Sequence, residues 1–445
     1  MSLIIKDIIM VNEGLQERSS LFIVDDHIEK IYAEGEVLPE SDIVIDGKGK
    51  YLLPGVIDEH VHFRDPGLVE KADIMTESIA AAAGGVTSFF DMPNTKPATT
   101  SKELLFDKLD LAKEKSVINY AFFYGASNKG SKEFGELDWN TIPGIKVFMG
   151  ASTGNMLVDD NDILQDIFAN CGKIPVMTHC EDSDKIATNA KEVCSKYGND
   201  PEVKFHSEIR NKEVCIASTK QAIALAEKYG TNLLIAHVSS KEELQLISKA
   251  GDNVKAEVCV AYLNFCDEDY AKKGTLIKCN PALKTRKDKI ALQEGLKKGL
   301  VYSIATDHAP HLLNDKQGGC ITATSGMPMV QFSLLSMLQL CEEKIINIEL
   351  IPKLMSHNPA SFFSVVNRGF IREGYKADLV LVSRRSENHI LENTEVLSKC
   401  GWTPLEGKEL AWKIDYTICN GKVVFDGKKV NIENRGEAVI FNRKN

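Results

Sequence analysis

Two histidines one residue apart, His60 and His62, follow a short apolar run in the stretch PGVIDEHVHFRDPG. Side chains at positions i and i+2 of a β-strand point to the same side, so a strand ending here aims both imidazoles at one point. Imidazole is a common ligand for zinc and related divalent ions. An isolated His-x-His is equally compatible with two solvated histidines at a strand end. The rest of the chain therefore has to decide whether this pair binds metal.

Between residues 53 and 368, apolar and β-rich runs alternate with segments of helical spacing. The eight runs are GVIDEHVHF, VTSFFDMPN, NYAFFYGAS, GIKVFMGAS, IPVMTHC, NLLIAHVSS, VKAEVCVAYLNF and YSIATDHAP. Eight alternations of a buried strand and a helix predict an α/β fold of the (β/α)8 TIM-barrel type. A doubly wound open sheet is the alternative, but no G-x-G-x-x-G follows any of the runs.

Function in such a barrel collects at the carboxyl ends of the strands. In chain order, the polar residues at the predicted strand ends are His60, His62, Asn94, Lys146, His179, His237 and Asp307. Four histidines and an aspartate at the ends of four strands predict a metal site. His60, His62 and Asp307 suit one ion, and His179 and His237 suit a second.

Lys146 needs a separate argument, because an ammonium group cannot ligate a metal. It lies between Ile145 and Val147 in an apolar strand, and burial beside two cations would lower its pKa. A neutral amine reacts with carbon dioxide to give a carbamate, which is a bridging anion. A lysine that extends to the barrel mouth is the simpler alternative. Opposite four histidines and an aspartate, we favour N6-carboxylated Lys146 as a bridge.

This set predicts two divalent metal ions, with Zn²⁺ the favoured metal, about 3.5–4 Å apart and bridged by a hydroxide. Such a pair lowers the pKa of bound water from 15.7 toward about 7 and polarises a carbonyl, which suits hydrolysis of amide-like bonds. The bridging hydroxide is the predicted nucleophile. Asp307 is the predicted general base and acid, which passes the proton to the leaving nitrogen.

The two ends of the chain have a different pattern from its middle. Residues 1–52 and 369–445 contain short strand-like runs and the turn signals Asn420-Gly421 and Asp426-Gly427. We expect both ends to build one small β-sandwich, in two parts, around a catalytic barrel of residues 53–368.

Composition excludes several classes of protein. The formal net charge of −10 argues against a nucleic-acid partner, and no apolar run is long enough for a membrane helix. No signal peptide is indicated at the N-terminus, and the eleven cysteines have no paired spacing. These features predict reduced thiols and a cytoplasmic protein.

The chain resembles the amidohydrolase superfamily over nearly its whole length. Within that superfamily, the stretches EHVHFRDPG, DMPNTKPATT, GIKVFMGASTG, THCED, AHVSS, KCNPALK and ATDHAPH resemble the dihydroorotase family. The resemblance implies that the substrate is bound by Arg64, Asn94, Asn280 and His311, and by backbone groups near Ala323 to Gly326.

The resemblance also implies an activity, the reversible hydrolysis of the cyclic amide of L-dihydroorotate to N-carbamoyl-L-aspartate in pyrimidine synthesis. An allantoinase-type or hydantoinase-type cyclic amidohydrolase is the alternative, and Arg64 together with Asn94 favours dihydroorotate. A different class of alternative is a non-catalytic scaffold, which typically loses metal ligands. A homodimer and an association with aspartate transcarbamoylase are further expectations from the resemblance.

Two stretches depart from the family pattern. Many bacterial relatives supply a bridging aspartate from the loop where this chain has Ser152 to Asn155, which leaves the bridging role to Lys146. The segment ATSGMPMVQF also differs from the expected glycine-rich pattern. Outside the motifs, we expect His206 and Arg210 to be structural and Cys180 to lie in the core.

Overall fold

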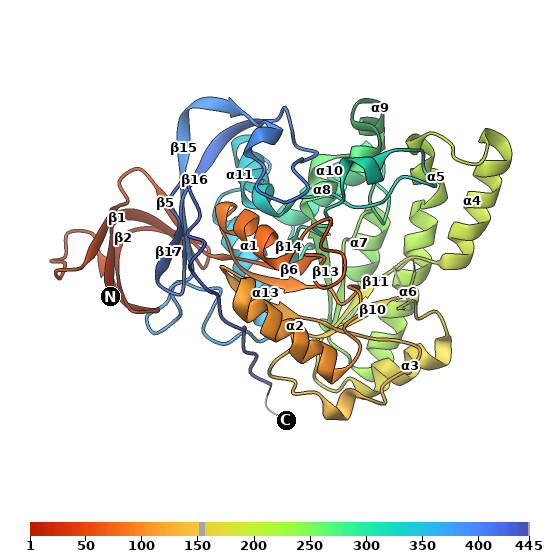
Figure 1. Ribbon diagram of the computed structural model, residues 1–445, viewed down its shortest axis with the longest axis horizontal. Helices are drawn as coiled ribbons and strands as arrows, with labels where there is room; N and C mark the ends of the chain where they lie inside the picture. The colour runs from red at the N-terminus through yellow and green to blue at the C-terminus, as the bar shows by residue number, and fades with distance from the viewer. Residues whose placement is uncertain (151–155, 444–445) are drawn as a thin grey trace.

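The structure, a computed structural model, describes residues 1–150 and 156–443 and combines a barrel with a terminal β-domain (Figure 1). The segment from Ser152 to Asn155 lies outside the described residues. Each of the eight predicted apolar runs contains at least one barrel strand. These strands are β6 (Val56–Val61), β7 (Val86–Asp91), β8 (Asn119–Phe122), β9 (Tyr124–Gly125), β10 (Ile145–Phe148), β11 (Val176–His179), β12 (Leu233–Ile235), β13 (Val254–Cys259) and β14 (Ser303–Ala305). The predicted (β/α)8 barrel is confirmed.

The barrel strands pair in parallel in two runs. Strands β6, β7 and β8 form one run, and strands β9 to β14 form the other. The third apolar run supplies both β8 and β9, so it links the two. The barrel closes where Val61 bridges His308 in parallel and the His62 N–H donates to the His308 carbonyl at 2.8 Å. This closure places the His-x-His segment directly beside Asp307.

Helices surround the barrel, and most long ones begin at a side-chain cap. Examples are Asp73 before α1, Asp182 before α4 and Asn211 before α6, each accepting from a backbone N–H of the first turn. The long helices are α1 (Ile74–Ala83), α2 (Lys102–Lys115), α3 (Asn161–Asn170), α4 (Ser183–Tyr197), α6 (Lys212–Tyr229), α10 (Arg286–Lys297) and α11 (Ser333–Glu342). Shorter ones are α5 (His206–Ile209), α7 (Lys241–Ile247), α8 (Val260–Asn264), α9 (Tyr270–Lys273), α12 (Leu350–Pro352) and α13 (Asn358–Phe362).

Both ends of the chain contribute to the second domain, as predicted. Its strands are β1 (Ser2–Asn12), β2 (Leu15–Val24), β3 (His27–Ala33), β4 (Ile43–Asp46), β5 (Tyr51–Pro54), β15 (Leu379–Ile390), β16 (Glu409–Cys419) and β17 (Lys422–Phe425). Strand β5 joins the two ends, because it pairs in parallel with β1 and antiparallel with β15. Strands from both ends share one buried apolar core, and Asn420-Gly421 forms the predicted turn between β16 and β17 with φ values of 51° and 72°.

The last described residues return to the barrel. Tyr120 in β8 donates to Glu437 O at 3.0 Å and accepts from Val439 N at 2.9 Å. Val439 and Phe441 are buried among apolar side chains of the barrel strands. The division of the chain at residues 52 and 368 stays a prediction, since this final segment packs on the barrel. Across the described residues, no helix combines the length and hydropathy needed to cross a membrane.

Candidate metal centre and substrate pocket

Three predicted metal ligands lie together where the barrel closes. Nε2 of His62 lies 3.0 Å from Asp307 Oδ1, and Nε2 of His60 lies 3.5 Å from the same oxygen. One ligand atom from each of the three residues falls within 4.8 Å of the others, a spacing suited to one metal ion. Both histidines are buried. The predicted grouping of these three residues is therefore present in the structure.

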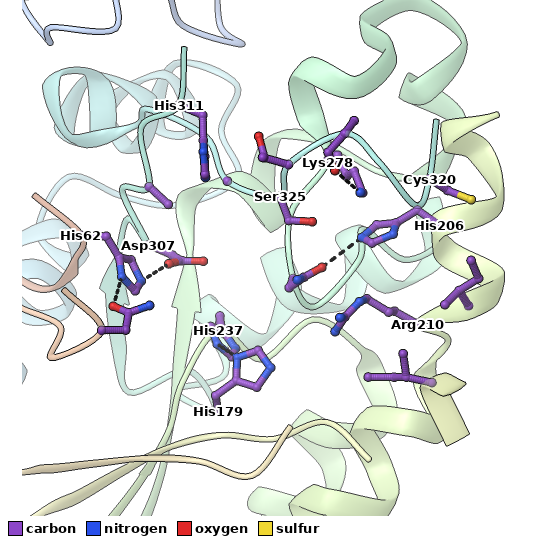
Figure 2. Close-up of a pocket in the computed structure, with 18 of the residues that line it drawn as sticks. His62, His179, His206, Arg210, His237, Lys278, Asp307, His311, Cys320 and Ser325 are labelled. Carbon is purple, nitrogen blue, oxygen red and sulfur yellow. Dashed lines mark hydrogen bonds and ion pairs between the residues drawn. The ribbon is translucent and has the colours of Figure 1, made fainter. Parts of the chain in front are cut away.

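The other predicted ligands surround this group. Nδ1 of His179 lies 2.8 Å from Nε2 of His237 (Figure 2). The ring centroids of His60 and His237 are 5.3 Å apart. The Lys146 side chain is fully buried, and its Nζ has no hydrogen-bond partner among the described residues. Burial lowers the pKa of Lys146 to about 8. Burial, followed by the charge of Lys146, holds the pKa of His60 well below its usual value.

Three of the histidines use one ring nitrogen for a polar partner and turn the other toward the cluster. Nδ1 of His60 faces Glu257, Nδ1 of His62 faces Asn94, and Nε2 of His179 faces Glu181, each at 2.8 Å. An acceptor on one nitrogen holds the N–H there and leaves the other lone pair for a metal. Together with the buried, unpartnered amine of Lys146, this donor set fits divalent metal ions.

Two of these partners were not predicted as such. Glu257 is buried in β13 and also accepts from the backbone N–H of His237 at 3.0 Å. Its carboxylate and the thiol of Cys259 form a second metal-capable group with His60. The only signal in the sequence was an acidic residue inside an apolar strand. Asn94 was predicted to bind substrate, and here its side chain contacts His62 while it also lines the cavity.

The backbone is strained at three residues of the site. Arg64, His237 and Asp307 have φ values of 68°, 42° and 48°, in the left-handed region that residues with a Cβ rarely adopt. Such conformations cost about 1–3 kcal/mol each and persist where the surroundings impose them. Their clustering at three strand ends is typical of a functional site.

Arg64 and His311 contact each other on one wall of the cavity. Nη2 of Arg64 donates to Nε2 of His311 at 3.0 Å, and its Nε donates to Pro310 O at 3.2 Å. Burial, then the nearby charge of Arg64, lowers the pKa of His311, so its ring is neutral. Although Arg64 is buried, no carboxylate of the described residues lies within ion-pair distance of it. A buried guanidinium without a counterion is ready for an anionic ligand.

The opposite wall contains residues that sequence reasoning placed in a structural role. His206 and Arg210 line the same cavity of about 500 Å³ as the predicted ligands, a position that was not predicted, and their structural role stays a prediction (Figure 2). Nε2 of His206 lies 3.1 Å from Asn280 Oδ1, and Arg210 pairs with Glu181. The segment from Ala323 to Gly326 lines the cavity as expected. Cys180 is buried in the core, as predicted.

Comparison with known proteins identifies the family. The model of the amidohydrolase family matches residues 51–424. The chain belongs to the amidohydrolase family. It is 33% identical to a dihydroorotase of Pyrococcus abyssi, over 95% of this chain and 94% of that protein. It is 31% identical to an allantoinase of Bacillus velezensis, over 95% of this chain and 93% of that protein.

The fold agrees with solved structures of the same kind. An L-hydantoinase from Arthrobacter aurescens superposes with a TM-score of 0.93, at 24% identity and 99% coverage of both chains. A dihydropyrimidinase from Brevibacillus agri superposes with a TM-score of 0.90, at 24% identity and 100% coverage of both chains. With its His60, His62 and Asp307 site, this amidohydrolase is a metal-dependent hydrolase of amide C–N bonds.

Proposed function

We propose that this amidohydrolase is a dihydroorotase, which reversibly hydrolyses the cyclic amide of L-dihydroorotate to N-carbamoyl-L-aspartate. The buried guanidinium of Arg64 carries this proposal, because it lies on the cavity wall without a carboxylate partner among the described residues. Dihydroorotate presents one carboxylate on a flat cyclic ureide, and a guanidinium binds a carboxylate through two parallel hydrogen bonds. Allantoin and unsubstituted hydantoin carry no carboxylate for this position.

The remaining wall residues complete the substrate site in this proposal. Asn94, Asn280 and His311 line the cavity with Arg64, and each presents a neutral polar group. Backbone groups from Ala323 to Gly326 contact the ureide ring. Lys316 fixes this segment, since its Nζ donates to Thr324 O and Gly326 O at 2.8 Å each. A fixed backbone edge suits a rigid ring with alternating N–H and C=O groups.

In the proposed holoenzyme, His60, His62, His179, His237, Asp307 and N6-carboxylated Lys146 hold two divalent ions. These ions, Zn²⁺ in this proposal, supply a water of lowered pKa and polarise the scissile carbonyl. Asp307 is the proposed proton carrier, because its carboxylate lies among the ligands and borders the cavity. It takes the proton of the attacking water and delivers it to the ring nitrogen that leaves.

The test is turnover of dihydroorotate, allantoin and hydantoin side by side with metal-loaded protein. We expect dihydroorotate to have by far the largest kcat/KM. Faster turnover of allantoin or hydantoin would assign the chain to one of the related activities. Absence of turnover with all three, in protein of verified metal content, would favour the non-catalytic scaffold.

The cellular setting and partners are part of the same proposal. All eleven cysteines are unpaired, which suits a reducing cytoplasm. We infer a homodimer and an association with aspartate transcarbamoylase from the family resemblance. Light scattering of the protein alone, and of a mixture with aspartate transcarbamoylase, tests both inferences.

A further inference from the structure

The cavity extends well beyond the predicted metal ligands. Its far side is formed by helix α4, by helix α5 with Arg210, and by the segment from Cys320 to Gly326 (Figure 2). Its volume of about 500 Å³ lies in the range of roughly 300–1,000 Å³ typical of pockets for drug-sized ligands. A single six-membered ring with one carboxylate fills only part of such a space. The far side therefore has room for a further group of the ligand.

Lys278 gives this far side a positive charge without a counterion. Its side chain lines the cavity and is 3% exposed, and its Nζ donates to Ala323 O. No carboxylate of the described residues lies within ion-pair distance of it. Although burial lowers the pKa of Lys278 to about 8, the amine is still mostly protonated at pH 7. A buried cation of this kind favours an anionic partner.

Unlike Lys316, Lys278 has N–H donors without an acceptor among the described residues. Lys316 is also buried, but its Nζ donates to three backbone carbonyls, those of Lys278, Thr324 and Gly326. An ammonium group has three N–H donors, so backbone carbonyls accept from all the donors of Lys316. The ammonium of Lys278 has one protein acceptor in the same part of the structure. Its other two N–H groups are available to a ligand in the cavity.

The neighbours of Lys278 do not neutralise it. Arg210 pairs with Glu181, so these two charges cancel each other. His206 donates from Nε2 to Cys279 O at 2.9 Å, and burial lowers the pKa of its ring to about 3, so it is neutral. Of these three residues, Lys278 alone carries a charge that no ion pair offsets; the carboxylate of Asp200 lies beyond ion-pair distance, and its charge acts to raise the pKa of Lys278.

The lining of the far side also includes apolar side chains. Ile186 and Ala190 of α4, with Ile209 of α5, line this part. The facing loop is held in place by Asp200, whose carboxylate accepts from the backbone N–H groups of Gly319, Ile321 and Thr322 at 2.8, 3.0 and 3.1 Å. Apolar side chains and a buried cation on one side of the cavity match a short aliphatic chain that ends in a carboxylate.

We propose that Lys278 is the centre of a second anion subsite, which binds the acidic end of a carboxyalkyl substituent on a cyclic ureide. The methylene groups of the substituent lie against Ile186, Ala190 and Ile209. This inference rests on the proposed function for the position of the ring at the metal ligands. It goes beyond that function, because the carboxylate of dihydroorotate is assigned to Arg64 on the opposite wall.

Calorimetric binding to the metal-loaded enzyme tests the subsite independently of dihydroorotate turnover. The probes are hydantoin-5-propionic acid and its neutral twin, hydantoin-5-propionamide, which differ in charge but hardly in shape. We expect the acid to bind the wild-type enzyme at least about tenfold more tightly than the amide. The preference should fall below about twofold in Lys278→Met and persist in Lys278→Arg. The control Lys185→Met removes an exposed lysine of α4, paired with Asp182, and should keep the full preference.

Two results would overturn the inference. The acid and the amide could bind the wild-type enzyme equally, or the preference for the acid could survive in Lys278→Met of unchanged metal content. If, in that second case, the preference vanished in Arg64→Met, the acid would lie on the Arg64 wall. The enzyme could also fail to turn over dihydroorotate while its preference for the acid still depends on Lys278. That result would reject the proposed substrate but support the subsite.

Discussion

The carboxylate of Glu257 holds His60 and His237 in place at the same time. One of its oxygens lies 2.8 Å from Nδ1 of His60 and 3.0 Å from the backbone N–H of His237. These residues come from strand β6 and from the end of β12, so a single buried group couples two predicted ligands of different metal ions. A group that orients a ligand from behind controls metal affinity nearly as strongly as the ligand itself.

Substitution Glu257→Gln should therefore weaken metal binding by about 10–100-fold, because the amide accepts less strongly from the His60 ring. Metal content after dialysis against graded chelator measures the change. Glu268→Gln, which alters an exposed ion pair with Arg286, is the matched control and should titrate like the wild type. Equal metal retention in all three proteins would mean that Glu257 only packs.

Substitution Arg64→Met should raise KM for dihydroorotate strongly and leave metal content normal. Loss of the charged partner at a desolvated contact costs about 2–5 kcal/mol. Steady-state kinetics with the metal-loaded variant measure the effect. Arg64→Lys keeps the charge but loses the paired geometry, so it should recover only part of the affinity. An unchanged KM in Arg64→Met would reject dihydroorotate as the substrate and favour a hydantoinase.

Substitution Asp307→Asn should lower kcat by about 10²–10⁴-fold through loss of the acid–base role. Metal analysis of the same preparation must accompany the kinetics, because Asp307 is also a predicted ligand. The decisive preparation is one that retains metal. If its kcat stays near the wild-type value, another residue moves the proton.

Lys146 should carry the added mass of one carbon dioxide molecule in a native mass spectrum of the metal-loaded enzyme. The modification and the metal should be lost together on chelation, since a free carbamate is labile. Lys146→Ala should lose most metal and nearly all activity, because the carbamate that offsets the repulsion between the two cations is then missing. A short carboxylic acid added with metal should restore part of the activity. Full activity of Lys146→Ala would mean that another group bridges the metals.

His206 should make the folded state sensitive to acid. Burial, with the charges of Arg210 and Lys278, lowers its pKa from 6.5 to about 3. Below about pH 6.5 the unfolded chain binds a proton that the folded protein excludes, so the free energy of unfolding falls with decreasing pH. For this group alone the loss reaches about 2 kcal/mol at pH 5. Urea unfolding from pH 8 to 5 should show a weaker pH dependence in His206→Gln, and parallel curves would contradict the assignment.

The barrel and its ligand positions could be predicted because they depend on local patterns. Strand β6 alternates its side chains, and the parallel strands all present their carboxyl ends on one side, which brings His62 and Asp307 together. The turn at Asn420-Gly421 could also be predicted from a local pattern, since a two-residue turn needs positive φ at both positions.

The far wall of the cavity could not be predicted, because its contacts join segments distant in the chain. His206 and Arg210 have helical spacing in a connecting segment, which says nothing about the face they present. Only the docking of α5 against the Lys278 region brings them to the cavity. The role of Glu257 could not be predicted for a similar reason, since its partner His60 is 197 residues away in the sequence.

Because the final segment packs against the barrel, the protein cannot finish folding during synthesis until that segment has left the ribosome. Val439 and Phe441 fill space among the barrel strands, and β15 to β17 complete the sheet begun by β1 to β5. A growing chain on the ribosome thus holds both domains open, with apolar surface uncovered, until these last residues emerge. Contacts between segments so distant in the chain form slowly, and the partly made chain is the form most exposed to aggregation.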